Sequence, residues 1–213
     1  GVSAFGNCYS LTAFTIPTSV TTLNTNSFAN CSGLTSIHIP ASVTSIGQNP
    51  FAGCSGLESI TVDEGNTRFT DGGCNVIVQN NNHDLISGCK NSVIPEDVVR
   101  ISTMAFNMCT GLTSIVIPNS VTYIGISAFQ ECTGLTSVTI GSGVTTISAR
   151  AFRYCSMLAS ISVLATTPPT FSGSGASLPF YNVPTDIPVY VPCESIEAYQ
   201  TDTGWSSFTN YQE

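Results

Sequence analysis

The stretch FANCSGLTSIHIPASVTSIG, from Phe28 to Gly47, decides the fold of this 213-residue chain because close copies of it recur along the sequence. Phenylalanine returns in steps of 23, 23, 55, 23 and 23 residues, and a cysteine follows each of these phenylalanines three positions later. Self-similarity at a fixed short period is the sequence signature of a solenoid, in which each repeat is one coil. The phenylalanines are Phe5, Phe28, Phe51, Phe106, Phe129 and Phe152, and the cysteines are Cys8, Cys31, Cys54, Cys109, Cys132 and Cys155.

Each repeat contains a short aliphatic segment with period-two character. In LTSIHIP, Ile37 and Ile39 point to one side while Ser36 and His38 point to the other, as in a β-strand with one buried face. Stacked coils place identical strands ~4.8 Å apart, so each aliphatic residue packs on its own copy. We expect a parallel β-sheet on one face, with short extended pieces and helical turns on the other. The sheet is predicted to have strands at Leu11, Leu34, Leu57, Val93, Leu112, Leu135, Leu158 and Ile187.

The 55-residue step marks one enlarged coil, at residues 63–92. In the segment CNVIVQ-NNNH-DLISGC, residues 74–89, the residues on both sides of a four-residue polar loop alternate in the manner of β-strands. This pattern predicts a β-hairpin. If Gln79 pairs with Asp84, then Val78 faces Leu85, Ile77 faces Ile86 and Cys74 faces Cys89. The directly opposed cysteines could form a disulfide or pack as free thiols.

The C-terminal segment departs from the repeat. Residues 165–186 are rich in Pro, Gly and Ser and predict an irregular loop, after which IPVYVP, residues 187–192, supplies a last strand. We interpret Cys193 to Tyr211, which includes the only tryptophan, as a cap over the open end of the core. The chain is therefore predicted to be one domain, residues 1–213, with regular repeats at 1–62 and 93–164 and a closing strand and cap at 165–213.

Composition limits the classes of partner. Charged residues make up 8% of the chain, and the net charge is −8 without any basic cluster, so nucleic acid and anionic membranes would be repelled. Ser, Thr or Pro interrupts every aliphatic run before it reaches the ~18 residues of a membrane-spanning helix. No signal-peptide pattern opens the chain, and no cofactor motif is present.

The units AFxxCxGLTSIxIPxSVTxIG resemble the BspA-like (Treponema pallidum type) leucine-rich repeat, and the resemblance covers nearly the whole chain. The enlarged coil and the tail with YVP (190–192), ESIEAY and GWSSF (204–208) are also similar to family features. This resemblance implies an extracellular or cell-surface protein used in adhesion to host proteins, other bacteria or glycans. The departures from the family pattern are Asn24, Ser102, Gly141, Leu164 and Cys193.

The cysteines at the repeat positions are predicted to pack in the core rather than to take part in chemistry. The six at the repeat positions are predicted to form a buried ladder of free thiols, because cysteine is readily buried, and Cys193 is expected to stay unpaired. No two cysteines have the close C-x₂₋₄-C spacing of a zinc site. DEGNTRFTDGG, residues 63–73, also lacks the residue order of a calcium loop.

The two histidines are better explained as surface residues than as catalysts. His38 occupies an outward strand position that holds threonine, valine or serine in other coils, and His83 sits in the hairpin loop. We therefore predict no enzyme and no metal, and a binding or adhesion scaffold for a protein or glycan partner. The alternative is a passive repeat spacer or a fragment of a larger adhesin. The candidate ligand-binding residues are Ser36, His38, Ser59, Thr61, Asn81, His83 and Asp84.

Overall fold

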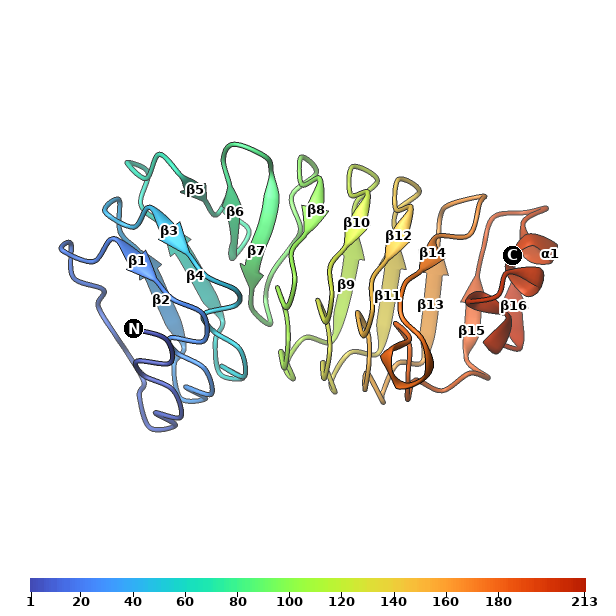
Figure 1. Ribbon diagram of the computed structural model, residues 1–213, viewed down its shortest axis with the longest axis horizontal. Helices are drawn as coiled ribbons and strands as arrows, with labels where there is room; N and C mark the ends of the chain where they lie inside the picture. Colours follow the sequence, from blue (N-terminus) through green and yellow to red (C-terminus); the bar gives the residue numbers. More distant parts are fainter.

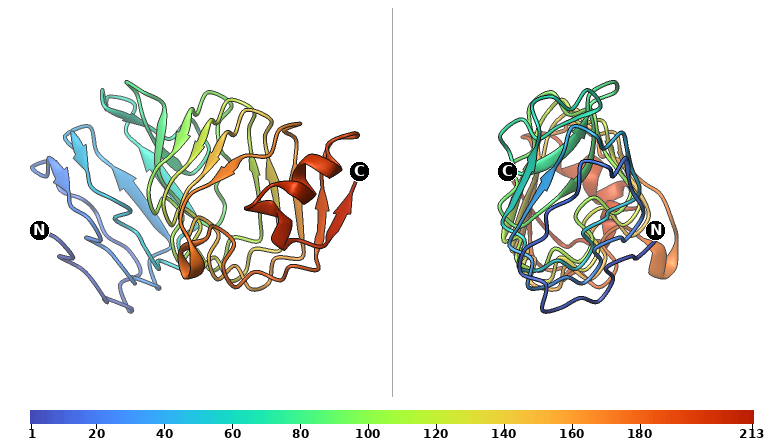
Figure 2. Two further views of the ribbon diagram at one scale, coloured as in Figure 1. Left: turned by 45° about the vertical axis from the view of Figure 1, so that its right-hand side comes forward. Right: turned by 90° about the vertical axis from the view of Figure 1, so that its left-hand side faces the viewer.

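The computed structural model describes residues 1–213 as an elongated stack of coils, with the two termini at opposite ends of the stack (Figure 1). Seen along the stack, successive coils overlie one another around a common core (Figure 2). Most coils contribute one strand of four residues and one strand of two residues, joined by tight turns. The solenoid predicted from the repeat is confirmed.

The four-residue strands form a parallel sheet whose register follows the repeat. β2 (Ser36–Ile39) pairs with β4 (Ser59–Val62), which places Ile37 next to Ile60. A five-stranded parallel sheet follows further along the stack, in the order β16-β15-β13-β11-β9. Its strands are β9 (Ser114–Ile117), β11 (Ser137–Ile140), β13 (Ser160–Val163), β15 (Pro188–Tyr190) and β16 (Asn210–Gln212).

The prediction of one continuous eight-stranded sheet is wrong in two places, because no strand forms at Leu11 or at Val93. Phe14 occupies the position that Ile37 has in the next coil. Its ring packs against the Phe28 ring, with centroids 5.2 Å apart, instead of extending the column of aliphatic residues. The Val93 backbone N–H donates to the Cys74 carbonyl within the enlarged coil, so it cannot donate to a neighbouring strand of the sheet. The sheet is therefore divided between β4 and β9.

The two-residue strands form a second sheet, which is also interrupted. β1 (Thr22–Leu23) pairs only with β3 (Ser45–Ile46). The other five two-residue strands and the two longer strands β6 and β7 form a mixed sheet in the order β14-β12-β10-β8-β7-β6-β5. They are β5 (Phe69–Thr70), β6 (Val76–Gln79), β7 (Asp84–Gly88), β8 (Arg100–Ile101), β10 (Tyr123–Ile124), β12 (Thr146–Ile147) and β14 (Thr170–Phe171).

The predicted hairpin is β6–β7, and Val78 lies opposite Leu85 as expected. A β-bulge between Ile77 and Val78 then shifts the register by one residue, so Ile77 faces Ser87 rather than Ile86. Cys74 and Cys89 are consequently not register partners, and both are free thiols. The sequence left open a disulfide or two packed thiols for this pair, and the structure contains two free thiols.

The buried phenylalanines stack as a ladder, which confirms the predicted core. Ring centroids are 5.0 Å apart for Phe5–Phe28 and for Phe129–Phe152. The ladder is broken at the enlarged coil, where the ring of Phe106 occupies the space that a side chain at Gly88 would need. The buried apolar residues accordingly form two clusters, with 15 residues in the N-terminal part and 37 in the rest.

The cysteines line a second ladder beside the phenylalanines. The Cys54 thiol donates to the Phe28 carbonyl of the preceding coil at 3.0 Å. The thiols of Cys31, Cys132 and Cys155 likewise donate to the phenylalanine carbonyl of the coil that precedes each of them. Burial raises the pKa of the Cys54, Cys109 and Cys155 thiols to about 12. Cys8 departs from the prediction of six buried thiols, because it is exposed in the first coil of the stack.

The C-terminal cap predicted from the sequence is present. It comprises α1 (Ile196–Thr201), η2 (Trp205–Ser207) and β16, the last of which the sequence did not reveal as a strand. Trp205 is fully buried, and its indole Nε1–H donates to the Pro169 carbonyl at 2.8 Å. The third helical segment, η1 (Gly175–Ser177), lies in the loop before β15.

We expect the ladder thiols to resist alkylation while the protein is folded. Iodoacetamide at pH 8 should label the exposed Cys8 and Cys193 first, because only thiolates react and burial keeps the ladder thiols protonated. Cys31, Cys54, Cys109, Cys132 and Cys155 should be labelled only after denaturation, as measured by peptide mass spectrometry. Three or more disulfides in the non-reduced protein would contradict this picture.

Replacing Trp205 with alanine should lower the free energy of unfolding by ~3–5 kcal/mol, because the large buried ring leaves a cavity over the last coil. Tyr190→Ala is the matched control, since that residue lies on β15 and is 43% exposed, so its loss should lower stability much less than the loss of Trp205. Thermal or urea melting measures both. Equal effects of the two changes would show that the tail does not act as a cap.

Candidate functional site

The structure divides the candidate residues between the two sheets. Ser36 and His38 lie on β2 directly beside Ser59 and Thr61 on β4, in the four-residue-strand sheet. Asn81 and His83 lie in the hairpin loop and Asp84 begins β7, in the other sheet. No hydrogen bond or ion pair joins the two groups, so they form two separate candidate surfaces.

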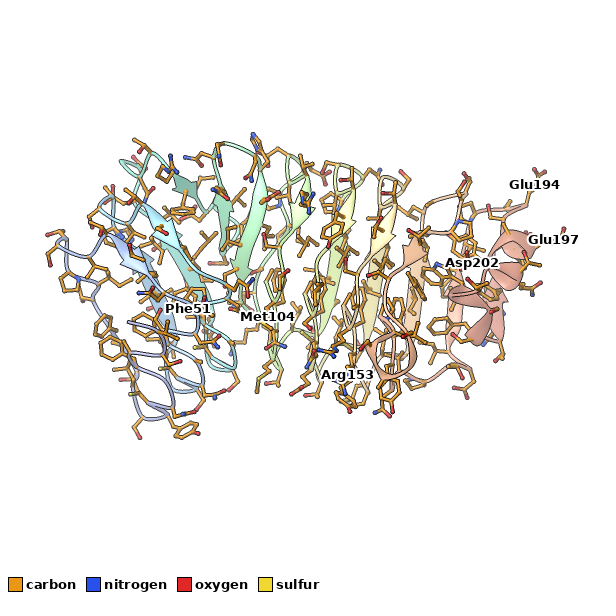
Figure 3. All side chains as sticks on the ribbon, viewed as in Figure 1. Phe51, Met104, Arg153, Glu194, Glu197 and Asp202 are labelled. Carbon is orange, nitrogen blue, oxygen red and sulfur yellow. The ribbon has the colours of Figure 1, made fainter.

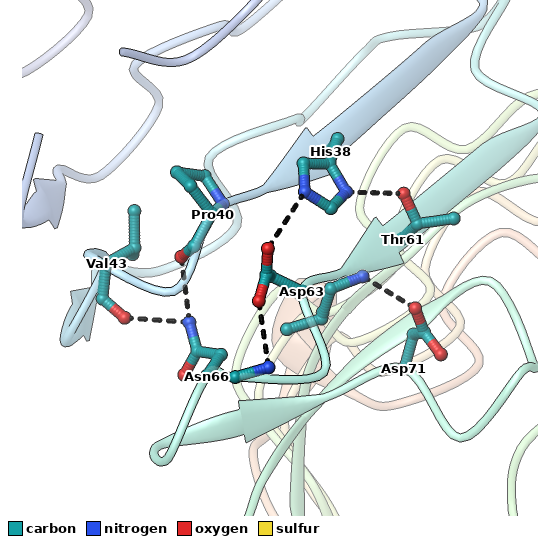
Figure 4. Close-up of polar contacts among 9 residues, drawn as sticks. His38, Pro40, Val43, Thr61, Asp63, Asn66 and Asp71 are labelled. Atoms are coloured by element: carbon teal, nitrogen blue, oxygen red, sulfur yellow. Dashed lines mark hydrogen bonds and ion pairs between the residues drawn. The ribbon is translucent and has the colours of Figure 1, made fainter. Parts of the chain in front are cut away.

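The first surface, here called the His38 patch, consists of His38, Thr61 and Asp63 (Figure 4). His38 Nδ1 lies 3.0 Å from Thr61 Oγ1, and His38 Nε2 lies 3.8 Å from Asp63 Oδ2. A hydroxyl, an imidazole and a carboxylate are the groups of a hydrolytic triad. The His38 side chain is 58% exposed, however, and none of the larger cavities is lined by these three residues. The patch is therefore an open polar surface.

Side chains of the enlarged coil hold this patch in place (Figure 4). The Asn66 amide donates to the carbonyls of Pro40 and Val43 at 3.0 Å each, which ties its turn to the turn of the preceding coil. Asp71 Oδ2 accepts a hydrogen bond of 2.6 Å from the backbone N–H of Val62 on β4. Asp71 thus satisfies an edge N–H that a neighbouring strand would otherwise need to satisfy.

The hairpin residues form short-range polar contacts of their own. His83 Nδ1 lies 2.9 Å from Asp97 Oδ2, and the Asn82 amide donates to Asp84 Oδ2 at 2.9 Å. Burial raises the pKa of the Asp84 carboxyl, and the guanidinium of Arg100 opposes that shift. Asn81 contributes to a small surface hollow of about 210 Å³, together with Thr67, Arg68 and Asn80.

A larger cleft of about 310 Å³ lies between the end of β3 and the strands β7 and β8, and we call it the β3–β7 cleft. Ile46, Gly47 and Gln48 form one wall, and Asp84, Ile86 and residues 100–103 form the other. The Arg100 guanidinium lies over the Tyr123 ring, 4.3 Å from its centroid, and its Nε is 3.9 Å from Asp84 Oδ1. Of the predicted site residues, only Asp84 lines this cleft.

The cleft residues Ile46, Arg100 and Tyr123 were missed at the sequence level, although part of the signal was present. Arg100 and Tyr123 are 23 residues apart, so the repeat places them side by side on β8 and β10. An arginine beside a tyrosine on one face of a sheet predicts a cation–π contact. The position of Ile46 depends on the hairpin displacing the next coil, which the repeat does not predict.

Asn49 follows the cleft residue Gln48 in the chain and is only 2% exposed. Its amide Nδ2 donates to the Met104 carbonyl at 2.6 Å, while its Oδ1 accepts from the Ser87 hydroxyl at 3.2 Å. Met104 and Phe51, labelled in Figure 3, mark the two sides of this junction. A single buried amide therefore connects the coil before the hairpin, the hairpin and the coil after it.

Two classes of feature are absent from the structure. No group of three or more His, Cys, Asp or Glu side chains is arranged to hold a metal ion. None of the helices has the length and apolar character needed to cross a membrane.

The stacked coils, with a parallel sheet on one face and short strands and turns elsewhere, define a leucine-rich-repeat solenoid. The family described as "BspA type leucine rich repeat region" matches residues 1–74 and 78–182 in six copies. The chain belongs to this family, which confirms the resemblance seen in its repeats.

Solved structures agree with this assignment. The pneumococcal vaccine antigen PcpA has a TM-score of 0.64 and 20% identity, over 99% of this chain and 64% of PcpA. A leucine-rich cell surface protein from Faecalibacterium prausnitzii has a TM-score of 0.57 and 28% identity, over 96% of this chain and 54% of that protein. A leucine-rich-repeat protein from Bacteroides ovatus has a TM-score of 0.56 and 25% identity, over 100% of this chain and 57% of that protein.

This chain thus spans between 54% and 64% of the length of these three proteins. No curated protein matches the sequence significantly. The comparisons therefore define family and fold.

We expect Asn49→Ala to lower the free energy of unfolding by ~1–3 kcal/mol, because the fully buried Ser87 hydroxyl would lose its acceptor and the Met104 carbonyl would keep only the Asn107 N–H. Asn26→Ala is the matched control. Asn26 holds the same corner position one coil earlier, also with positive φ, but its side chain makes no hydrogen bond. Urea denaturation of both variants gives the comparison, and an equal loss of stability would contradict the role of Asn49 as a junction.

Proposed function

We propose that this chain is a non-enzymatic binding scaffold displayed at the bacterial cell surface or secreted, where it adheres to a protein or glycan partner. The observation that carries the proposal is that the enlarged coil interrupts both sheets and creates the β3–β7 cleft. Asp84, Arg100 and Tyr123 come together there, on a molecule in which only 8% of residues are charged. Charged and aromatic side chains gathered on a rigid scaffold are typical of a recognition site.

Membership of the BspA type family supports a surface location, as does the 28% identity to a protein described as a leucine-rich cell surface protein. The low content of charged residues supports weak contacts spread over an extended surface. The His38 patch provides a second possible contact area, because Ser36, Ser59 and Thr61 surround the imidazole with small hydroxyls.

A passive spacer is the competing proposal, and the outward face of the regular coils favours it. The outward columns of β9, β11 and β13 carry only small side chains, namely Ser114, Ser137, Ser160, Val116, Thr139 and Ser162. Such columns lack the aromatic and arginine anchors that dominate tight interfaces. In this proposal the chain holds another part of a larger adhesin away from the cell.

An array of glycans and host proteins, screened with the intact domain, tests whether the chain binds a partner. Two variants then assign the surface: His38→Ala with Thr61→Val for the His38 patch, and Asn81→Ala with Asp84→Ala for the hairpin side. Thr139→Val with Ser162→Ala, on the regular coils, is the control. We expect at least a tenfold loss of affinity from one of the first two variants, and little change from the control.

Full binding by both variants, with the fold intact by circular dichroism, would exclude these surfaces. The absence of any partner in the screen would favour the spacer.

A further inference from the structure

β3 lacks a neighbour that every other short strand of the regular coils has. In those coils, the strand of the next coil donates to two carbonyls: Thr145 donates to Thr122, and Ser148 donates to Ile124. The equivalent carbonyls on β3 belong to Thr44 and Ile46, and neither accepts a backbone hydrogen bond. The edge of β3 that faces away from β1 is therefore unpaired.

The missing strand also leaves part of the core uncovered. Leu23 is 4% exposed, and Ile101, Ile124 and Ile147 are fully buried at the corresponding position of other coils. Ile46 alone among them is only half-buried and lines the β3–β7 cleft. Unpaired backbone groups and an uncovered aliphatic side chain thus occur at the same place.

The cause is the hairpin. In a regular coil, Arg68 and Phe69 would continue the sheet beyond β3, but Phe69 instead begins β5, which pairs antiparallel with β6. β7 then stands across the cleft from β3 and is already paired on both of its edges, to β6 and β8. β3 therefore has the only free strand edge in the cleft.

The lining of the cleft is compatible with an extended chain. The cleft volume of about 310 Å³ is at the lower end of the ~300–1,000 Å³ of pockets that enclose small molecules. Asp84 and Arg100 place one charge of each sign on the far wall. A wall with balanced charge favours an occupant that is uncharged at its centre.

We propose that the β3–β7 cleft binds an extended segment of a partner protein, which adds to the β1–β3 sheet as a third, parallel strand. The carbonyls of Thr44 and Ile46 accept from its backbone, and an aliphatic side chain of the segment covers Ile46. This inference rests on the proposed binding function and names its ligand class. Main-chain pairing at an exposed edge provides affinity, and pockets for alternate side chains provide specificity.

The regular coils define the chemistry of the occupant. Three short-strand segments are of the Thr-x-Ile kind, at residues 44–46, 122–124 and 145–147, and two of them lie side by side where β12 pairs with β10. The threonine of such a segment faces solvent and its isoleucine faces the core. The partner segment should therefore alternate hydroxyl and aliphatic residues, a pattern that a glycan does not provide.

A peptide that copies residues 143–149, acetyl-GVTTISA-amide, is a direct probe because this segment already pairs with a short strand in the native chain. In the free protein, the Ile46 amide should exchange with solvent at least tenfold faster than the Ile101 and Ile124 amides. Addition of the peptide should slow Ile46 exchange at least tenfold, as followed by hydrogen-exchange NMR.

Two methylated peptides test the backbone contact. N-methylation at the positions of Thr145 and Ser148 removes the two donors that pair with the preceding coil, so affinity should fall at least tenfold. N-methylation at the Ile147 position alters the opposite edge and should change affinity less than threefold. Equal affinity of the two methylated peptides would overturn the strand-addition proposal.

A pair of protein variants tests the location. Ile46→Asp places a charge where the aliphatic contact is proposed and should reduce binding at least tenfold. Ser45→Asp adds the same charge at the adjacent, exposed position of β3 and should change binding less than threefold. Circular dichroism and melting confirm that both variants fold.

Protection of the Ile46 amide in the free protein, absence of peptide binding, or equal binding by the two variants would overturn the inference. The array screen tests the proposed binding function separately from the peptide site. An array partner whose binding is unaffected by Ile46→Asp would retain that function while removing the peptide site.

Discussion

Each coil of this chain is stable only because another coil with the same side chains in the same register lies against it. The rings of Phe129 and Phe152 stack at 5.0 Å, Ile115 adjoins Val138 on neighbouring strands, and the Cys155 thiol bonds to the preceding coil. A single coil has too little surface to bury its own aliphatic face, so stability arises at the interfaces between coils. The cap, the hairpin and the cleft are all consequences of how this stacking begins, is interrupted or ends.

The sequence predicted the parts of the fold in which a coil has an equivalent neighbour on both sides. The burial of Phe129 and Cys132, the strand at Leu135 and the hairpin pairing of Val78 with Leu85 followed from periodicity alone. Errors fall where one neighbour is missing or altered: Cys8 is exposed, Leu11 and Val93 form no strand, and β16 was not foreseen. A one-residue bulge at Ile77 is decided by local packing, which a repeat pattern does not encode.

The candidate site was predictable to a similar degree. The contact of His38 with Thr61 follows from their 23-residue spacing, whereas the distribution of the candidate residues over two sheets required the structure. The β3–β7 cleft depends on how far the hairpin displaces the next coil. Asn49 illustrates the limit, because Asn26 has the same residue type at the same repeat position, and only the three-dimensional surroundings give Asn49 its role.

The division of the core into clusters of 15 and 37 buried residues has a consequence for cooperativity. In repeat proteins, folding free energy is close to a sum of coil and interface contributions, so the weakest interface marks where one folding unit ends and the next begins. Here that boundary lies at the hairpin, where Asn49 hydrogen-bonds to both sides. Trp205 closes the outer end of the larger unit. Partial unfolding of the unit with the smaller core would therefore stop at the hairpin, leaving the capped unit intact.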